Sequence, residues 1–385
     1  MRRVVALTMF ASLLALGGCS SFSWNPLEWF SSGPRHPPTP LQPLTNAIPV
    51  RTLWHASISG ADREFFEPAV AEGSVYAAGA DGSVARFDAS TGHEIWRVDV
   101  GSRLSGGVGS DGVVVAVGSR EGEVTVLEAS GEERWKARVS SEVLAAPAIT
   151  RDLVIVRSAD SRVFAFNVRD GQRRWVYQRP TPSLSVRSPA GIVPAGPYVF
   201  AGFPGGKLVA LAQSNGGLRW EGTVSLPHGT TELERMSDVS GLPWIGGGQA
   251  CAVAHQGRVA CFDLANGNLL WARPMSSSAG LAVDDRYVYV SEDIGAVSAL
   301  ARSGGTSLWR QNKLEYRDLS APLAFGEYVI VGDAEGYVHI LAADTGEFVG
   351  REKTDDTAIA AAPVRIEGGF LVQTAGGGLY AFALR

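Results

Sequence analysis

The chain of 385 residues has few cysteines and no excess of basic residues. Its 3 cysteines are too few for a disulfide-rich scaffold. Its 34 lysines and arginines are outnumbered by 39 aspartates and glutamates, which gives a formal net charge of -5. This balance argues against a dedicated nucleic-acid-binding protein, because such a protein needs a basic surface to displace counterions from phosphates. The hydrophobic content of 45% in turn excludes wholesale disorder.

The sequence also lacks the spacings that are typical of metal, phosphate and hydrolase sites. Its 6 histidines are scattered without a His-x-x-x-His pattern, and no Cys-x-x-Cys pair occurs, so no metal site is predicted. Glycine runs at 246–248 and 376–378 do not precede predicted helices, which argues against phosphate binding. No Gly-x-Ser-x-Gly elbow points to a serine hydrolase, although composition alone leaves a Ser-His-Asp site open.

Residues 1–18 have the features of an export signal. Two arginines precede an uncharged stretch over residues 4–16, which is shorter than the roughly 20 residues that a bilayer-spanning helix needs. The sequence Leu-Gly-Gly-Cys that ends at Cys19 resembles a bacterial lipobox, which implies that Cys19 becomes the acylated first residue of the mature chain. Ser20 resembles the residue that follows this cysteine in lipoproteins of the outer membrane. The alternative is an ordinary signal peptide with a chance cysteine.

Residues 19–49 are predicted to be the acylated cysteine and a tether. The segment is rich in serine and proline, with five prolines between positions 34 and 43. Successive prolines keep a chain extended and semi-rigid. The segment is therefore expected to hold the folded part of the protein off the lipid surface.

Residues 50–385 contain one sequence unit that is repeated eight times. In the first copy, the turn at 80–82 leads through Gly92 to Trp96. Five further copies end in a tryptophan, namely Trp135, Trp175, Trp220, Trp271 and Trp309. Four short strands in roughly 40 residues, with a periodic glycine and tryptophan, are typical of a β-propeller blade. The sequence thus predicts an all-β fold, a single eight-bladed β-propeller domain with four antiparallel strands in each blade.

The two ends of the repeated region complement each other. The seventh copy has Gly350 where tryptophan is expected, and the eighth reaches the C-terminus before its tryptophan segment. Conversely, residues 52–54 match the tryptophan-containing strand of a unit, but the other strands of such a unit do not precede them. This N-terminal strand is therefore predicted to complete the last blade, because a closed ring leaves no open sheet edge.

Two neighbouring units have longer connections to the blade that follows. Trp175 and Trp220 are 45 positions apart, and Trp220 and Trp271 are 51 apart, whereas most intervals are near 40. The extra residues lie at 179–187 and at roughly 225–240, and both connections emerge at the same end of a propeller. They predict one contiguous patch on one rim, and function is often carried by loops on a rigid scaffold. Loops tucked into a groove between blades are the alternative.

The repeated units resemble the tryptophan-containing blades of quinoprotein dehydrogenases. The whole pattern of lipobox, proline-rich tether and eight blades resembles the BamB family of lipoproteins from the outer-membrane β-barrel assembly machinery. This resemblance implies a non-enzymatic scaffold without a cofactor, anchored by lipid to the periplasmic face of the outer membrane. Its implied partners are the periplasmic domains of BamA, other assembly subunits and unfolded outer-membrane proteins, and its implied role is to assist the insertion of β-barrel proteins.

The same resemblance assigns BamA binding to the two long connections. Family members carry a Leu-x-Leu-Arg-like sequence in the first, which Leu184, Val186 and Arg187 match with valine for the second leucine. In the second connection Asp238 is retained. Ser240 stands where the family often has a second acid, which puts that contact in question.

Two functions of other classes stand beside the scaffold. A quinone-dependent periplasmic dehydrogenase needs Ca²⁺ bound by carboxylate and amide oxygens near the ring axis, and usually has a pair of adjacent cysteines. The chain has no adjacent cysteines and is much shorter than such enzymes. The other alternative is a periplasmic binding protein for a ligand or for peptidoglycan.

Cys251 and Cys261 flank a predicted turn at 255–257. A three-residue loop would place them opposite each other on two strands, where a disulfide can form in the oxidising periplasm. A two-residue loop would point them to opposite faces. Cys261 also takes the position of a small alanine in other units, such as Ala165 and Ala210, which suits a buried free thiol. The sequence does not decide between the two.

Overall fold

The computed structural model describes residues 36–44, 47–62, 64–180, 182 and 184–384. Contacts divide the chain into the units Met1–Pro37 and Pro38–Arg385, and all described strands belong to the second. The predicted signal peptide and Cys19 lie outside the described residues.

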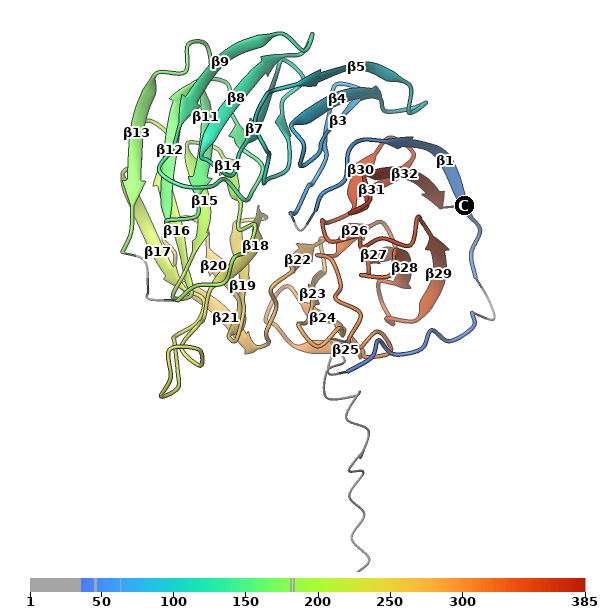
Figure 1. Ribbon diagram of the computed structural model, residues 1–385. Coiled ribbons are helices and arrows are strands. Elements are labelled where there is room, and N and C mark those ends of the chain that lie inside the picture. Colours follow the sequence, from blue (N-terminus) through green and yellow to red (C-terminus); the bar gives the residue numbers. More distant parts are fainter. Residues whose placement is uncertain (1–35, 45–46, 63, 181, 183, 385) are drawn as a thin grey trace, which may run out of the picture. The chain divides into compact units, whose positions relative to one another are not determined.

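The second unit consists of eight antiparallel sheets of four strands each, arranged in a ring (Figure 1). We number them blades 1 to 8. Blades 1 to 4 are β2–β5 (Ala69–Ala71, Ser74–Ala78, Ser83–Asp88, Glu94–Asp99), β6–β9 (Gly109–Ser110, Val114–Gly118, Glu123–Glu128, Glu133–Arg138), β10–β13 (Ala148–Ile149, Leu153–Ser158, Arg162–Asn167, Arg173–Gln178) and β14–β17 (Ile192–Ala195, Tyr198–Phe203, Lys207–Ala212, Leu218–Thr223). Blades 5 to 7 are β18–β21 (Val239–Gly246, Gln249–Ala254, Arg258–Asp263, Leu269–Pro274), β22–β25 (Gly280–Val283, Tyr287–Ser291, Val297–Ala301, Ser307–Gln311) and β26–β29 (Leu323–Phe325, Tyr328–Gly332, Tyr337–Ala342, Phe348–Lys353). Blade 8 combines β30–β32 (Val364–Ile366, Gly369–Gln373, Gly378–Leu384) with β1 (Val50–Ser57). The predicted eight-bladed propeller is confirmed.

The hydrophobic core lies between neighbouring blades. One cluster, for example, joins Val114 and Val124 of blade 2 to Val154 and Phe164 of blade 3. The two middle strands of a blade are therefore almost entirely buried, whereas the outermost strand alternates between covered and exposed positions. Each blade covers its apolar faces only against its neighbours, so the ring folds as one unit.

The repeated tryptophan and glycine meet across the interface between blades. Trp135 lies in the outermost strand of blade 2, and its Nε1–H donates to the carbonyl oxygen of Val168 in blade 3 at 3.0 Å. Gly171, in the turn beyond, has a φ of +70°, and a Cβ there would lie 2.7 Å from Trp135 Cδ2. The other tryptophan–carbonyl pairs are Trp54–Ala89, Trp96–Ala129, Trp175–Gln213, Trp220–Leu264, Trp271–Arg302 and Trp309–Ala343. Glycine is needed because the ring occupies the space of a side chain.

The missing tryptophan at Gly350 has a structural explanation. Its partner would be a turn between the third and fourth strands of blade 8, and that turn does not exist, because β32 and β1 are the two ends of the folded chain. The N-terminal segment lies there instead. A Cβ on Gly350 would come within 3.3 Å of Val50 Cγ2, and the Ile48 N–H donates to the Val349 carbonyl oxygen at 2.7 Å.

The N-terminal strand closes the ring as predicted. β1 pairs with β32 from Val50 opposite Leu384 to Ser57 opposite Gly378, with one irregularity near Trp54 (Figure 1). The Trp54 side chain then reaches blade 1, where its Nε1–H donates to the Ala89 carbonyl oxygen at 2.9 Å. One strand thus completes blade 8 and also contacts blade 1.

An arm that precedes β1, formed by residues 38–44 and 47–49, contacts blade 7. Arg317 Nη1 donates to the Thr39 carbonyl oxygen at 3.0 Å, and Arg351 Nη1 donates to that of Gln42 at 2.9 Å. Leu41 packs against the core between blades 6 and 7. Part of the segment predicted as a tether therefore lies against the ring.

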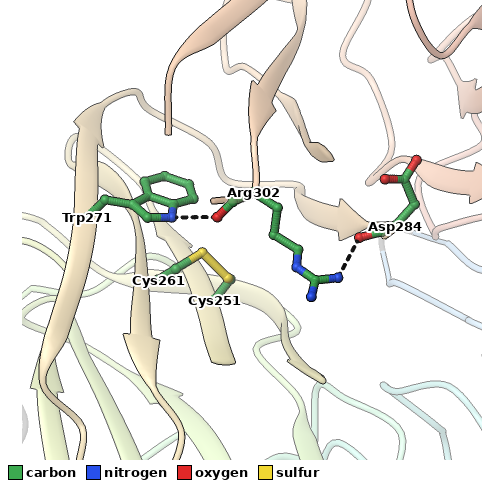
Figure 2. Close-up of a disulfide and its surroundings, with 5 residues drawn as sticks. All are labelled: Cys251, Cys261, Trp271, Asp284 and Arg302. Carbon is green, nitrogen blue, oxygen red and sulfur yellow. Dashed lines mark hydrogen bonds between the residues drawn. A yellow bond between two sulfur atoms is a disulfide. The ribbon is translucent and has the colours of Figure 1, made fainter. Parts of the chain in front are cut away.

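Cys251 and Cys261 form a disulfide inside blade 5 (Figure 2). They are directly opposite each other on β19 and β20, and the loop between these strands has three residues, 255–257. Both side chains are fully buried beside Trp271, whose Nε1–H donates to the Arg302 carbonyl oxygen in blade 6 at 2.8 Å. The bridge thus lies in the core between blades 5 and 6.

We expect this disulfide to stabilise the ring measurably. Closing a loop of 10 residues contributes about 2.7 kcal/mol by the chain-entropy relation, or about 4 °C in Tm for a ring of this size. In a chain that begins at Pro38, titration of unfolded, unreduced protein should detect no free thiol, and the protein refolded after reduction should melt about 4 °C lower. The double variant Cys251→Ala/Cys261→Ala should melt at the same temperature with and without reductant. Two free thiols before reduction would contradict the bridge.

Candidate partner-binding loops

The long connections lie on one face of the ring. Because the four strands of a blade alternate in direction, the connections between blades and the turns between second and third strands share the same end of the sheets. We call this end the connection face. It carries the connection 179–191, between β13 and β14, and the connection 224–238, between β17 and β18.

The first connection exposes an aliphatic side chain next to a fixed arginine. Leu184 is 43% exposed, whereas Val186 is half-buried. Arg187 Nη2 lies 2.8 Å from Glu64 Oε2 and 3.0 Å from Glu142 Oε2. The Arg187 guanidinium is therefore held between two other connections, those that enter blade 1 and blade 3.

These charges form a network across the connection face. The Glu64 carboxylate is almost completely buried and also forms an ion pair with Arg120, whose Nη2 lies 2.7 Å from Glu64 Oε1. The hydrogen bond to Glu142 raises the pKa of Arg187 above its usual value, and Glu64 adds to this effect. A guanidinium with two carboxylates in fixed positions loses little freedom when a partner binds. The loop is thus presented in one conformation.

Asp238 lies beneath the first connection instead of on the surface. Its side chain is 3% exposed. Oδ2 accepts the backbone N–H of Val186 at 2.6 Å, and Oδ1 accepts that of Gly205 at 3.1 Å. The carboxylate therefore joins the two long connections and sets the position of Leu184 and Arg187.

The second connection contributes exposed apolar and acidic residues. Leu226 and Leu233 are 57% and 64% exposed. The Glu234 carboxylate accepts the backbone N–H groups of Thr231 and Thr230, and these bonds lower the pKa of Glu234 below its usual value. Glu234 therefore orders its own loop while it stays accessible on the surface.

Ser240, which stands where the family often has a second acidic residue, is buried. Its Oγ donates to the Ser277 carbonyl oxygen at 2.5 Å. Ser240 therefore contributes to the interior of blade 5 and not to the surface of the patch.

The central channel offers little for a metal-bound quinone. It has a volume of about 630 Å³ and is lined by the innermost strands of the blades. Among its described lining residues, Glu67 is the single titratable side chain, and burial raises the pKa of Glu67 to about 7. Ca²⁺ takes six to eight oxygen ligands, usually with several carboxylates, so this lining does not fit a Ca²⁺–quinone pair.

In the described part of the chain, no group of three or more His, Cys, Asp or Glu is placed to hold a metal ion. No helix there is long and apolar enough to cross a membrane.

Sequence reasoning did not find Glu64, Glu142 or Arg157. Glu64 and Glu142 lie 123 and 45 positions from Arg187 and belong to connections of ordinary length. They meet Arg187 through the ring geometry, and no local motif marks them. Arg157 lies beside the first connection, and a comparison of the repeats could have found it, because the equivalent positions of the other blades hold small or uncharged residues.

Comparison with known proteins agrees with this architecture. A sequence profile described as outer membrane protein assembly factor BamB matches residues 80–311 and 293–385. The assembly factor BamB of Bordetella pertussis is 43% identical over 98% of this chain and 96% of its own length, and that of Burkholderia pseudomallei is 43% identical over 97% and 96%. The crystal structure of BamB from Moraxella catarrhalis superposes with a TM-score of 0.81 at 27% identity, covering 87% of this chain and all of that one. The chain therefore belongs to the family of outer membrane protein assembly factor BamB.

Proposed function

We propose that the protein is a non-enzymatic scaffold of the outer-membrane β-barrel assembly machinery. Its relatives are named outer membrane protein assembly factors. In this proposal the acylated Cys19 holds the ring at the periplasmic face of the outer membrane, and the connection face binds the periplasmic domains of BamA. Other assembly subunits and unfolded outer-membrane proteins are further partners of the same scaffold.

One observation carries the assignment of the binding surface. An exposed leucine, Leu184, stands on a loop whose backbone and neighbouring arginine are already fixed by buried carboxylates. A preorganised loop binds more tightly than a mobile one, because less conformational entropy is lost on association. Arginine is enriched at interface hot spots, and the exposed leucine beside it supplies apolar area that a partner can bury.

Recovery of BamA from solubilised membranes tests this function. The full-length lipoprotein should retain BamA, and Leu184→Asp should reduce the retained amount at least tenfold, because a charge would replace an apolar contact worth about 1.4 kcal/mol or more. Arg187→Glu should have a similar effect, since it places a third carboxylate beside Glu64 and Glu142.

Leu218→Asp is the matched control. Leu218 is 53% exposed, but it begins β17 and so lies at the opposite end of the sheets from the connection face. This variant should retain BamA like the unmodified protein, and Leu184→Asp and Leu218→Asp should both show the Tm of the unmodified protein. Absence of BamA from the unmodified sample would refute the proposed function.

A further inference from the structure

A small pocket opens on the connection face between blades 3 and 4. Its volume is about 180 Å³. The first long connection forms one wall with Val186, Arg187 and Ala190, while Glu142 and Arg157 form the others. The pocket therefore lies directly beneath the loop that exposes Leu184.

Arg157 is exceptional among the repeated units. The equivalent positions of the other seven blades hold Ala78, Gly118, Gly202, Val253, Ser291, Gly332 and Gln373. In three of them the position is glycine because a branched side chain occupies the space, either from the following connection or from the start of the next blade. A Cβ on Gly118, Gly202 or Gly332 would collide with Val143, Val239 or Ile359, respectively. The propeller framework thus does not require arginine here, and blade 3 has an open pocket at a place that three of the other blades fill.

The Arg157 side chain is half-buried and forms no ion pair with a carboxylate of the described residues. Nη1 donates to the Ala190 carbonyl oxygen at 2.9 Å, and the guanidinium carbon lies 5.4 Å from the centre of the Phe203 ring. Nε is buried and has no hydrogen-bond partner among the described residues. Burial lowers the pKa of Arg157 to about 10, so the side chain stays charged at neutral pH.

The nearby acids are engaged elsewhere. Asp238 accepts two backbone N–H groups, from Val186 and Gly205. Glu142, on the pocket wall, is paired with Arg187 through two nitrogens at 3.3 and 3.0 Å. Because these carboxylates are already bonded, Arg157 retains unused donor capacity, and a buried donor without an acceptor costs about 1–3 kcal/mol.

We infer that this pocket receives a carboxylate side chain, aspartate or glutamate, from the protein that docks on the Leu184 loop. The inference rests on the proposed function and names the chemistry of the partner residue. A guanidinium forms its strongest hydrogen bonds with carboxylates and binds them through two parallel N–H donors. Folding has already removed much of Arg157 from water, including Nε, so most of the remaining desolvation cost falls on the incoming acid. The occupant would be one side chain, because the pocket has no room for a strand.

A double-mutant cycle with BamA tests the inference. The affinity of the purified periplasmic domains for the full chain should fall about 30-fold or more in Arg157→Gln, as is typical for a buried charge pair that loses one member. One acidic residue of BamA should show the same loss when it is changed to alanine, and no further loss when it is combined with Arg157→Gln. Arg86→Gln is the matched control, because Arg86 Nη1 likewise donates to a backbone carbonyl oxygen, that of Ala129 at 3.0 Å, at the opposite end of the sheets.

A second readout separates this inference from the proposed function. The ¹⁵Nε–H resonance of Arg157 should shift saturably when N-acetylglutamate is added and should not respond to N-acetylglutamine. If the unmodified protein binds BamA and Arg157→Gln binds equally well, the pocket inference is wrong and the proposed function stands. If BamA does not bind but the resonance shifts with glutamate alone, the proposed function fails and the carboxylate pocket stands. An unresponsive resonance refutes the pocket.

Discussion

Removal of β1 should prevent the ring from folding, whereas removal of the preceding arm should leave a folded ring of lower stability. A chain that begins at Ile58 lacks the outermost strand of blade 8 and the Trp54 side chain that contacts blade 1. Loss of one buried tryptophan costs about 3–5 kcal/mol, and a domain has about 5–15 kcal/mol in total. The missing strand adds the loss of its pairing with β32, whose edge would then be open to aggregation.

A chain that begins at Pro49 is the matched comparison. It keeps β1 but loses the packing of Leu41 and Ile48 and the contacts of Arg317 and Arg351 with the arm. Partial burial of two aliphatic side chains contributes about 2–4 kcal/mol, so its urea midpoint should fall below that of a chain that begins at Pro38. A cooperative unfolding transition in the chain that begins at Ile58 would show that β1 is not needed to close the ring.

The sequence predicted the fold because the same contact is made repeatedly. The tryptophan of one blade rests on the turn glycine of the next, as Trp135 does on Gly171, so seven of the eight interfaces leave the same pair of residue types in the sequence. The exception was informative as well. Gly350 departs from the pattern because blade 8 lacks the turn that a tryptophan would contact, since its third and fourth strands, β32 and β1, are not consecutive in the chain.

The functional surface was less accessible to sequence reasoning. The lengths of the two connections predicted where a patch would lie, but not which side chains would reach solvent. Asp238 and Leu184 each lie in one of the two long connections, yet the charged residue is 3% exposed and the apolar one 43% exposed. The difference arises because Asp238 accepts N–H groups from two other segments, and those partners are set by the ring.

Replacement of Asp238 by alanine should weaken both the fold and BamA binding without removing a surface contact. The variant leaves the backbone N–H groups of Val186 and Gly205 without their acceptor, and it removes a negative charge that favours the charged form of Arg157. Two hydrogen bonds to a charged group contribute about 3–5 kcal/mol together. Released from this acceptor, the loop would have to be ordered again on binding, so the affinity for the periplasmic domains of BamA should fall about 100-fold or more.

Amide hydrogen exchange separates positioning from direct contact. In Asp238→Ala the Val186 amide should exchange orders of magnitude faster than in the unmodified protein, in parallel with the loss of affinity. Asp238→Asn keeps one side-chain oxygen acceptor, so its Val186 exchange rate and its affinity for BamA should lie between those of the unmodified protein and of Asp238→Ala. Asp152→Ala removes an exposed aspartate at the opposite end of blade 3 and should change neither quantity. If Asp238→Ala abolished binding while the Val186 amide stayed protected, the carboxylate would have to contact the partner itself, which would require the connection to open on binding.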